Sequence, residues 1–363
     1  MGQSIEAAVL RTAPGDVEVV RLTLDDPAPH EVVVRVRASG LCHSDLAVMR
    51  GKVARDLPMV LGHEVAGTVE RVGSEVTSLA VGDTVVACLS ASCGLCRACL
   101  RGRHVLCQNP GAAREPGEQA RLTGPDGMVQ QSSNIGGFAE KVLVHERNLV
   151  AVTEELPYEQ LALLGCAVLT GVGGVLNRRL DPASTAAVIG CGGVGLNVIQ
   201  GLRLAGFTDI VGIDRFESKI QVARGFGATE GLAAGSAADV LEQLGTRFAA
   251  GFDYVFESVG SGTTAELAFG LLAPAGTAFL MGVMADDEVI SLPAGAFLRE
   301  RTVTGLLMGS GRFQRDIPQL ARQAAQGRID IERLISRRTD LDGINDAYRD
   351  LATGTLSRVV VTF

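Results

Sequence analysis

The chain has 363 residues, which is long for a single hydrophobic core, so the length favours two domains. It carries 33 basic and 41 acidic residues, a net charge of -8, and no basic block interleaved with aromatic residues, which argues against a nucleic-acid partner. We find no run of about 18 apolar residues in the sequence, so no membrane span is predicted. The N-terminus MGQSIEAAVLR lacks a signal-peptide pattern, so we expect a cytoplasmic protein.

The first third of the sequence predicts short β-strands. EVVVRVRASG (31–40), VAGTVERVG (65–73) and VGDTVVACL (81–89) are apolar with partial alternation and are punctuated by glycines. This pattern indicates an all-β, barrel-like domain. Near residue 160 the composition changes to LALLGCAVLTGVGGVL (161–176), which is long enough for a buried helix.

From Thr185 onward the sequence alternates between strands and helices, which indicates βαβ units around a parallel sheet. A strand, a glycine-rich turn, a helix and a strand are predicted at TAAVIG, CGGVG, LNVIQGLRLAG and DIVGID, followed by a helix at ESKIQVARGFG and a strand at FDYVFESVG. The C-terminal part predicts a helix at DIPQLARQAAQG and a final strand at SRVVVTF. The sequence therefore predicts an α/β protein with a doubly wound parallel sheet in its second domain.

Four cysteines lie close together in CGLCRACLRGRHVLC, with the spacing C-x2-C-x2-C-x7-C: they are Cys93, Cys96, Cys99 and Cys107. Four thiolates can fill the tetrahedral coordination shell of one Zn²⁺, which leaves no position for water or substrate. The alternative is an iron–sulfur site, because short C-x2-C-x2-C runs also occur in ferredoxins. A structural zinc is favoured, because the run occurs once and no proline follows its last cysteine.

Three scattered residues form a second candidate ligand set: Cys42 in SGLCHSDL, His63 in LGHEVAG and Cys166 in LLGCAVL. Two sulfurs and one imidazole would leave the fourth position of a tetrahedral zinc open for chemistry. Asp45 and Glu64 lie beside the first two and could orient a metal-bound imidazole. Taken alone, Cys166 could equally be a small buried hydrophobic residue.

The turn GCGGVG (190–195) follows a predicted strand and opens a predicted helix, which is the context of a dinucleotide-binding motif. Gly192 would let the backbone approach a pyrophosphate at the helix N-terminus. Asp214 ends the next strand and could accept both hydroxyls of an adenosine ribose while repelling a 2′-phosphate, which favours NAD over NADP. Arg215 could bind such a phosphate, and a plain glycine-rich turn is the structural alternative.

The segment GHEVAGTVERVGSEV matches the G-H-E-x2-G-x5-G-x2-V signature of the zinc-containing medium-chain alcohol dehydrogenases, with CHSD before it and GCAVLTG after the four-cysteine segment. The sequence resembles this family over essentially its whole length, through SRVVVTF. The resemblance implies a GroES-like β-barrel catalytic domain and a Rossmann NAD-binding domain. The expected boundaries are 1–167 and 308–363 for the first, with a structural zinc lobe at 93–107, and 168–307 for the second.

The resemblance also implies roles for single residues. It places the catalytic zinc at Cys42, His63, Glu64 and Cys166, with Glu64 behind the metal and Asp45 hydrogen-bonded to His63. Ser44 matches the hydroxyl that takes the proton of the alcohol, whereas Ala47 stands where many relatives have a histidine that passes this proton to solvent. A water molecule or His43 would have to replace that histidine.

Further residues are implied by the resemblance to contact the cofactor, with His43 and Arg358 near its pyrophosphate and Lys219 near its ribose. The expected cofactor contacts are Gly190, Gly192, Gly193, Val194, Gly195, Asp214, Arg215, Lys219, His43, Val259, Met281, Val283 and Arg358. The alternative for Lys219 and Arg358 is a solvated surface charge.

Substrate and assembly are indicated less directly. Leu89, Met281 and Met308 match substrate-lining positions, which would suit a bulky apolar or aromatic alcohol, with ordinary core packing as the alternative. The long polar loop Gln108–Gly136 is expected to shape the pocket mouth. It resembles the dimeric branch of the family, with VISLPAGAF as a candidate edge strand for joining two sheets, so we expect a homodimer, with a homotetramer as the alternative.

The sequence thus predicts a zinc- and NAD-dependent dehydrogenase of primary or secondary alcohols with two zinc ions per chain. A second enzyme hypothesis is a thiol-dependent formaldehyde dehydrogenase, in which Arg114 would bind an anionic thiol cofactor. A non-enzymatic protein that retains the fold is the third, and it predicts damaged ligands. Cys42, His63, Cys166 and Ser44 are all present, which argues against this third hypothesis.

Overall fold

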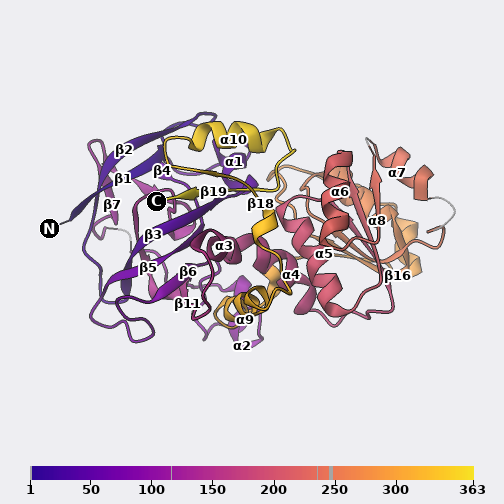
Figure 1. The fold of residues 1–363 in the computed structure, drawn as a ribbon, viewed down its shortest axis with the longest axis horizontal. Coiled ribbons are helices and arrows are strands. Elements are labelled where there is room, and N and C mark those ends of the chain that lie inside the picture. The colour runs from indigo at the N-terminus through magenta and orange to yellow at the C-terminus, as the bar shows by residue number, and fades with distance from the viewer. Residues whose placement is uncertain (1, 116, 235, 245–247) are drawn as a thin grey trace. The chain divides into compact units, whose positions relative to one another are not determined.

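The computed structural model describes residues 2–115, 117–234, 236–244 and 248–363, and the chain divides into two compact units (Figure 1). Unit 1 comprises the residues up to Leu169 together with Gly311–Phe363, and unit 2 comprises Thr170–Ser310. The chain therefore returns to unit 1 after completing unit 2, so that its first and last segments belong to the same unit.

The described residues of unit 1 form two mainly antiparallel sheets. The first has the strand order β8–β7–β2–β1–β4–β9, and its strands are β1 (Gln3–Leu10), β2 (Val17–Leu24), β4 (Met59–Val60), β7 (Leu122–Gly124), β8 (Gly127–Met128) and β9 (Gln130–Gln131). The second has the order β11–β6–β5–β3–β19–β18 with β10 paired to β3, and its strands are β3 (Glu31–Leu41), β5 (Glu64–Val72), β6 (Thr84–Ala87), β10 (Lys141–His145), β11 (Leu149–Ala151), β18 (Ile335–Thr339) and β19 (Arg358–Thr362).

Strand β3 forms the wall between two hydrophobic cores of unit 1. Its sequence EVVVRVRASGL alternates sides with a period of two residues. Val32 and Val34 therefore pack into one core, whereas Val33 and Leu41 pack into the other. Strands β5, β10 and β19 all pair with β3. This central strand ends directly before Cys42, so the position of that residue is fixed by the barrel.

The predicted buried helix is present as one apolar segment that runs from Tyr158 to Leu176. It consists of α3 (Tyr158–Leu163), the π-helix η4 (Leu164–Val168) and α4 (Leu169–Leu176). No membrane span was expected from the sequence, yet this helix of 19 residues is long and apolar enough to cross a membrane. Because 83 % of its most apolar stretch of 18 residues is buried inside the protein, it is packed as a core helix.

The remaining helices of unit 1 lie around the two sheets. They are α1 (His43–Met49), α2 (Arg97–Leu100), α9 (Phe313–Ala325) and α10 (Ile344–Ala352). α10 packs its buried residues Ile344, Ala347, Tyr348 and Leu351 into the core that contains Leu41. The predicted C-terminal helix and the predicted final strand correspond to α9 and β19.

Unit 2 is built around a parallel sheet with the order β14–β13–β12–β15–β16–β17 among its described strands. The strands are β12 (Thr185–Ile189), β13 (Asp209–Asp214), β14 (Glu230–Ala233), β15 (Phe252–Glu257), β16 (Leu272–Leu280) and β17 (Thr302–Gly305). The helices between them are α5 (Gly193–Ala205), α6 (Glu217–Phe226), α7 (Ala237–Leu244) and α8 (Gly262–Gly270). The reversal of strand order beside β12 is the doubly wound arrangement that the sequence predicts.

Two expectations about local structure were wrong, one of a strand and one of a loop. VISLPAGAF is not a strand: Val289–Pro293 is irregular, and the 3-10 helix η5 (Ala294–Arg299) begins after Pro293, which has a φ of -64° and no N–H to donate to a sheet. The segment Gln108–Gly136 is not a loop throughout, because it contains β7, β8 and β9. The turn between β7 and β8 is Pro125-Asp126, flanked by Gly124 and Gly127, and this turn signature was present in the sequence.

Candidate functional site

The four-cysteine cluster is assembled from its own short segment of chain. The sulfur atoms of Cys93, Cys96, Cys99 and Cys107 all lie within 4.8 Å of one another, and three of the four residues are partly exposed. Backbone N–H groups point at the sulfurs: Cys93 donates to Cys107 Sγ and Cys96 donates to Cys93 Sγ, each at 3.3 Å. Such donors stabilise thiolates, and backbone hydrogen bonds from Cys99 and Gln108 lower the pKa of Cys96 to about 6.

The scattered ligands also converge. One ligand atom from each of Cys42, His63, Glu64 and Cys166 lies within 4.8 Å of the others. Cys42 follows β3 and is the N-cap residue of α1, His63 precedes β5, and Glu64 is the first residue of that strand. All four residues are buried. The fold thus brings together residues that are far apart in the sequence.

Cys166 lies in the π-helix η4, which was not expected from the sequence. Single π-helical turns within α-helices are rare and are frequently found at functional sites. Gly165 precedes it, and a Cβ there would lie 2.3 Å from the carbonyl oxygen of Ala87 in β6. The close packing of this turn against the barrel therefore requires glycine, and it sets the position of the next residue, Cys166.

His63 is held by Asp45, as the resemblance implies. Its Nδ1 lies 3.3 Å from Asp45 Oδ1, which also accepts a hydrogen bond from the Gly62 amide at 3.3 Å. Burial lowers the pKa of His63, but the Asp45 carboxylate and Cys42 outweigh it, so the pKa is raised well above its ordinary value. With Nδ1 bonded to a carboxylate, Nε2 is the nitrogen that remains for a metal ion.

Glu64 and Arg358 form a buried ion pair behind these ligands. Arg358 is 2 % exposed, lies 3.5 Å from Glu64 Oε1 through Nη1, and donates to the carbonyl oxygen of Leu41 at 3.2 Å. It is therefore not a solvated surface charge. Burial raises the pKa of Glu64 to about 7 against the opposing charge of Arg358. A Cβ at Gly40 would meet Glu64 Oε2 at 2.2 Å, so this carboxylate needs a glycine opposite it.

The donor chemistry fits zinc. Two sulfurs and one imidazole are the ligands that zinc prefers, and three protein ligands leave one position open. Neither Glu64 oxygen accepts a hydrogen bond from the described residues, which is costly for a buried carboxylate. A nearby divalent cation would relieve that cost. Cys42, His63 and Cys166 would hold the metal, with Glu64 next to them.

The residues at the start of α1 continue the same segment. His43 is exposed and Ser44 is partly buried, and both lie in the first turn of the helix. Ala47 packs against the hydrophobic core of unit 1 and offers no group for proton transfer. The proton-accepting role of the Ser44 hydroxyl, which lies two residues after Cys42, stays a prediction.

In the glycine-rich turn of unit 2, the physical reason for a glycine differs from one position to the next. Gly190 has a φ of +90°, and a Cβ at Gly195 would lie 1.8 Å from the Gly190 carbonyl oxygen, so both are required by the fold itself. Gly192 has a φ of -86°, and a Cβ there would meet, of the described atoms, only Lys219 Nζ at 3.9 Å. Neither conformation nor packing requires this glycine. The space beside it fits a ligand at the N-terminus of the 13-residue helix α5, in whose first turn Gly193 and Val194 lie.

Asp214 lies at the end of β13, beside this turn. Its Oδ2 accepts a hydrogen bond from the Cys191 amide at 2.9 Å, and its Oδ1 accepts one from the Phe216 amide at 3.1 Å. Each carboxylate oxygen can accept a second hydrogen bond. Arg215 lies over the ring of Phe216, with 4.6 Å between the guanidinium carbon and the ring centre. Lys219 is buried rather than solvated, and burial lowers its pKa although Asp214 opposes that shift.

The apolar residues predicted near cofactor or substrate differ in exposure. Val259 and Val283 are 54 % and 59 % exposed at the carboxyl ends of β15 and β16, and Met281 next to them is partly buried. Met308 is buried and accepts a hydrogen bond from Thr170 Oγ1 through its sulfur at 3.5 Å. Leu89 packs against a core of unit 1. These contacts of Leu89 and Met308 are core packing, and their substrate-lining role stays a prediction.

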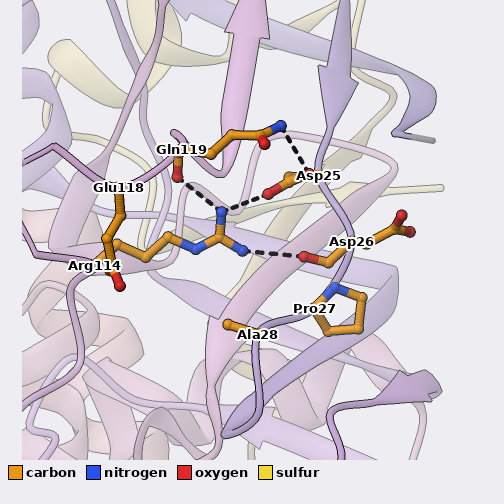
Figure 2. A pocket seen from close by; sticks show the side chains of 7 residues that line it. All are labelled: Asp25, Asp26, Pro27, Ala28, Arg114, Glu118 and Gln119. Carbon is orange, nitrogen blue, oxygen red and sulfur yellow. Dashed lines mark hydrogen bonds and ion pairs between the residues drawn. The ribbon is translucent and has the colours of Figure 1, made fainter.

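Arg114 does not offer a free guanidinium group. It lies in a cavity of about 350 Å³ that is lined by Asp25, Asp26, Pro27, Ala28, Arg114, Glu118 and Gln119. Figure 2 shows the side chains of these residues. The N–H groups of Arg114 donate to the Asp25 carboxylate and to the carbonyl oxygens of Asp26 and Gln119 (Figure 2). They also donate to both oxygens of Glu31. The expectation that Arg114 would bind an anionic thiol was therefore wrong, because its charge is already compensated by carboxylates from the barrel.

Comparisons with known proteins identify the two domains and several relatives of the chain. Residues 28–154 match the model of the alcohol dehydrogenase GroES-like domain, and residues 193–326 match that of the zinc-binding dehydrogenase. A class-3 alcohol dehydrogenase from Myxine glutinosa is 32 % identical over 98 % of this chain and 97 % of its own.

Two solved structures are similar over nearly the whole chain. An alcohol dehydrogenase zinc-binding domain protein from Burkholderia ambifaria is 32 % identical, covers 100 % of both chains and has a TM-score of 0.93. The benzyl alcohol dehydrogenase from Acinetobacter calcoaceticus is 30 % identical, covers 99 % of both chains and has a TM-score of 0.90.

Proposed function

Because the chain belongs to the zinc-containing medium-chain dehydrogenase/reductase family, and is an alcohol dehydrogenase of the zinc type, we propose that it transfers a hydride reversibly between a primary or secondary alcohol and NAD. The observation that carries the proposal is the convergence of Cys42, His63 and Cys166 within 4.8 Å, with the carboxylate of Glu64 beside them, whose oxygens accept no hydrogen bond from the described residues. This set supports an open zinc site, whereas the four-cysteine cluster supports a closed one, so we propose two zinc ions per chain.

The charges of Cys42, Cys166 and Glu64 at the proposed catalytic site are compensated. Two thiolates from Cys42 and Cys166 would offset the charge of one divalent cation, and Arg358 offsets Glu64. When bound, zinc would polarise the alcohol oxygen and lower the pKa of its hydroxyl, and NAD would accept the hydride. Ser44 would take the hydroxyl proton. Asp45 would keep the imidazole of His63 oriented through the hydrogen bond at its Nδ1.

The glycine-rich turn supports a dinucleotide and favours NAD. The space beside Gly192 and the amides at the N-terminus of α5 would receive the pyrophosphate. The free acceptor positions of Asp214 would bind the adenosine ribose, and its negative charge would repel a 2′-phosphate. Arg215, which could attract such a phosphate, lies over the ring of Phe216.

An apolar or aromatic alcohol is the substrate class that we propose. The benzyl alcohol dehydrogenase from Acinetobacter calcoaceticus, which covers 99 % of this chain, supports aromatic alcohols as the first compounds to test. The hypothesis of a thiol-dependent formaldehyde dehydrogenase relied on a free Arg114, and it loses this support because Arg114 already pairs with Asp25 and Glu31. We also propose a homodimer, on the family resemblance alone.

The proposed activity is tested by metal analysis together with a substrate panel. Zinc-loaded protein is expected to contain two zinc ions per chain and to reduce NAD faster than NADP with aromatic and aliphatic primary or secondary alcohols, followed by NADH absorbance. Formaldehyde with low-molecular-weight thiols forms a separate arm. The proposal is wrong if protein with two zinc ions reduces neither cofactor with any alcohol of the panel, and faster turnover in the thiol arm would replace the substrate class.

A further inference from the structure

Glu257, the last residue of β15, is a buried carboxylate that the proposed chemistry does not use. It is 0 % exposed, and its Oε1 accepts hydrogen bonds from the amides of Val259 and Gly260, each at 2.7 Å, and from Thr264 Oγ1 at 2.9 Å. Its Oε2 is also buried and accepts no hydrogen bond from the described residues. Burying a carboxylate is costly, so the three short hydrogen bonds at one oxygen indicate that the turn after β15 depends on it.

The backbone of Glu257 fixes a second loop, which follows β16. Its carbonyl oxygen accepts hydrogen bonds from the amides of Met281 at 2.8 Å and Gly282 at 3.2 Å. The two loops touch backbone to backbone: a Cβ at Gly282 would lie 2.1 Å from the Gly260 nitrogen, and a Cβ at Gly260 would lie 2.4 Å from the Val283 carbonyl oxygen. A shift of the Val259–Gly260 turn would therefore displace the loop after β16 as well.

Ser258 joins this arrangement to the glycine-rich turn. Its hydroxyl donates to the carbonyl oxygens of Gly190 at 2.9 Å and Ile189 at 3.1 Å. Glu257 is in register with Ile189 on one side and Leu280 on the other, so the carboxyl ends of β12, β15 and β16 are level. Glu257 and Ser258 thus link the glycine-rich turn after β12 to the loops after β15 and β16. All three lie at the edge where doubly wound sheets bind ligands.

The order of the strands says which part of a dinucleotide this edge would contact. β13, which carries Asp214, and β15 lie on opposite sides of β12. If Asp214 binds the adenosine ribose and Gly192 faces the pyrophosphate, the other half of the cofactor lies over β15 and β16. The exposed side chains of Val259 and Val283 lie there, at 54 % and 59 % exposure.

We propose that Glu257 is a positioning residue for the nicotinamide half of the cofactor. It holds the Val259 and Gly260 amides in the turn, in which Gly260 has a φ of +84°, and so sets the surface that Val259 and Val283 present. Without the carboxylate the two amides lose their partner and the turn relaxes. The inference rests on the proposed function, because it assumes that the parallel sheet binds a nicotinamide dinucleotide.

The test compares two ligands that differ only in the nicotinamide. Dissociation constants are measured for NADH by fluorescence and for ADP-ribose by competition, with the wild type, Glu257→Ala, Glu257→Gln and the control Glu266→Ala. Glu266, on α8, also accepts a backbone hydrogen bond, from Ser291 at 2.8 Å, whereas the Val259 and Gly260 amides both donate to Glu257. We expect Glu257→Ala to raise the Kd of NADH about tenfold and that of ADP-ribose less than about twofold. Glu257→Gln should recover most of the affinity, because its amide oxygen can accept the same hydrogen bonds.

Two results would overturn the inference: an unchanged NADH Kd in Glu257→Ala, or an equal loss for both ligands, which is the signature of a purely structural role. If Glu257→Ala does not fold, Glu257→Asp serves in its place, because it keeps the charge and withdraws the oxygens by one methylene. A wild type that binds neither NADH nor ADP-ribose contradicts the proposed function. A wild type that binds both, with no selective loss in the variants, contradicts the role of Glu257 alone.

Discussion

The two groups of metal-type ligands in unit 1 are built in opposite ways. Cys93, Cys96, Cys99 and Cys107 come from a single stretch of fifteen residues, and three of them are partly exposed. Cys42, the adjacent pair His63 and Glu64, and Cys166 come from three places far apart in the chain, and all four residues are buried. The sulfurs of the first group are approached by backbone amides of their own segment, whereas the second group is positioned by β3, β5 and the π-helix η4.

This difference predicts what each group contributes. A short segment with few buried apolar side chains gains its order from a bound metal, so loss of a ligand there should affect folding. Ligands that are fixed by the pairing of long strands are already in place without the metal. Loss of one of them should affect chemistry and leave the fold intact. Crossed substitutions, one in each group, test this contrast.

The largest effect is expected for Cys42→Ala. We expect kcat/KM to fall by at least about ten-thousandfold, because losing the charge stabilisation of a metal removes several kcal/mol and each 1.4 kcal/mol is worth about tenfold. Folding should be retained, since Cys42 is the N-cap of α1 yet its side chain makes no capping hydrogen bond in the described part of the chain. Turnover, zinc content and thermal unfolding are measured together, and full activity in this variant would show the zinc assignment to be wrong.

Cys99→Ala should give the reverse result. Cys99 is 4 % exposed, and its pKa is raised to about 12 by burial and by the neighbouring Cys96, so without metal this thiol is neutral. We expect the loss of one zinc ion and of about 4 kcal/mol of stability, the linkage for a ligand at about a thousandfold its Kd. Limited proteolysis should cut within residues 93–107, while turnover per intact molecule changes little. If the variant keeps two zinc ions and resists the protease as the wild type does, the four-cysteine segment does not depend on a bound metal for its order, and the proposed difference between the two groups is wrong.

The same contrast explains what could be predicted from the sequence. The four-cysteine cluster and the segment DIVGID, which is β13, are local patterns, and they were predicted with their positions. Cys42, His63 and Cys166 were a candidate ligand set by residue type alone, and their convergence at one zinc was implied by the resemblance to a family, because no local rule joins residues so far apart. The π-helix that carries Cys166 was not predicted, since it depends on the packing of Gly165 against the Ala87 carbonyl oxygen.

Charged residues were the least predictable part. Arg358 precedes the apolar run VVVT and could be read as exposed, but its partner Glu64 lies on a strand from the other end of the chain. Arg114 was predicted to be available to a ligand, and its five hydrogen bonds to the segment around Asp25 and Glu31 are contacts between distant segments. The partners of an arginine are set by tertiary structure, which a pattern of residues does not encode.

The third prediction concerns the segment after the four-cysteine cluster. This segment contains Arg114 and Arg121, whose ion pairs with Glu31 hold it in place. Glu31 is 3 % exposed and accepts hydrogen bonds from Arg114 Nη2 at 2.6 Å and Arg121 Nε at 2.7 Å. Burial raises its pKa, but the two arginines outweigh burial and lower it from 4.5 to about 2. The folded-state pKa is therefore below the unfolded one. The stabilisation is fully present above pH 4.5 and is lost as the pH falls toward 2.

We expect Glu31→Gln to lose about 3 kcal/mol of stability at neutral pH, the free energy that corresponds to this pKa shift. The difference from the wild type should shrink as the pH falls from about 4.5 to about 3, because the Glu31 carboxylate of the unfolded wild type takes up a proton in this range while that of the folded protein stays charged until about pH 2. Denaturant unfolding over this range measures it. Glu18→Gln is the matched control: its exposed pair with Arg11, at 2.9 Å, should contribute little. If metal orders the four-cysteine segment and charge orders the next, chelation of zinc should leave this pH dependence unchanged. A pH dependence that disappears with the zinc would mean that the two segments fold as one.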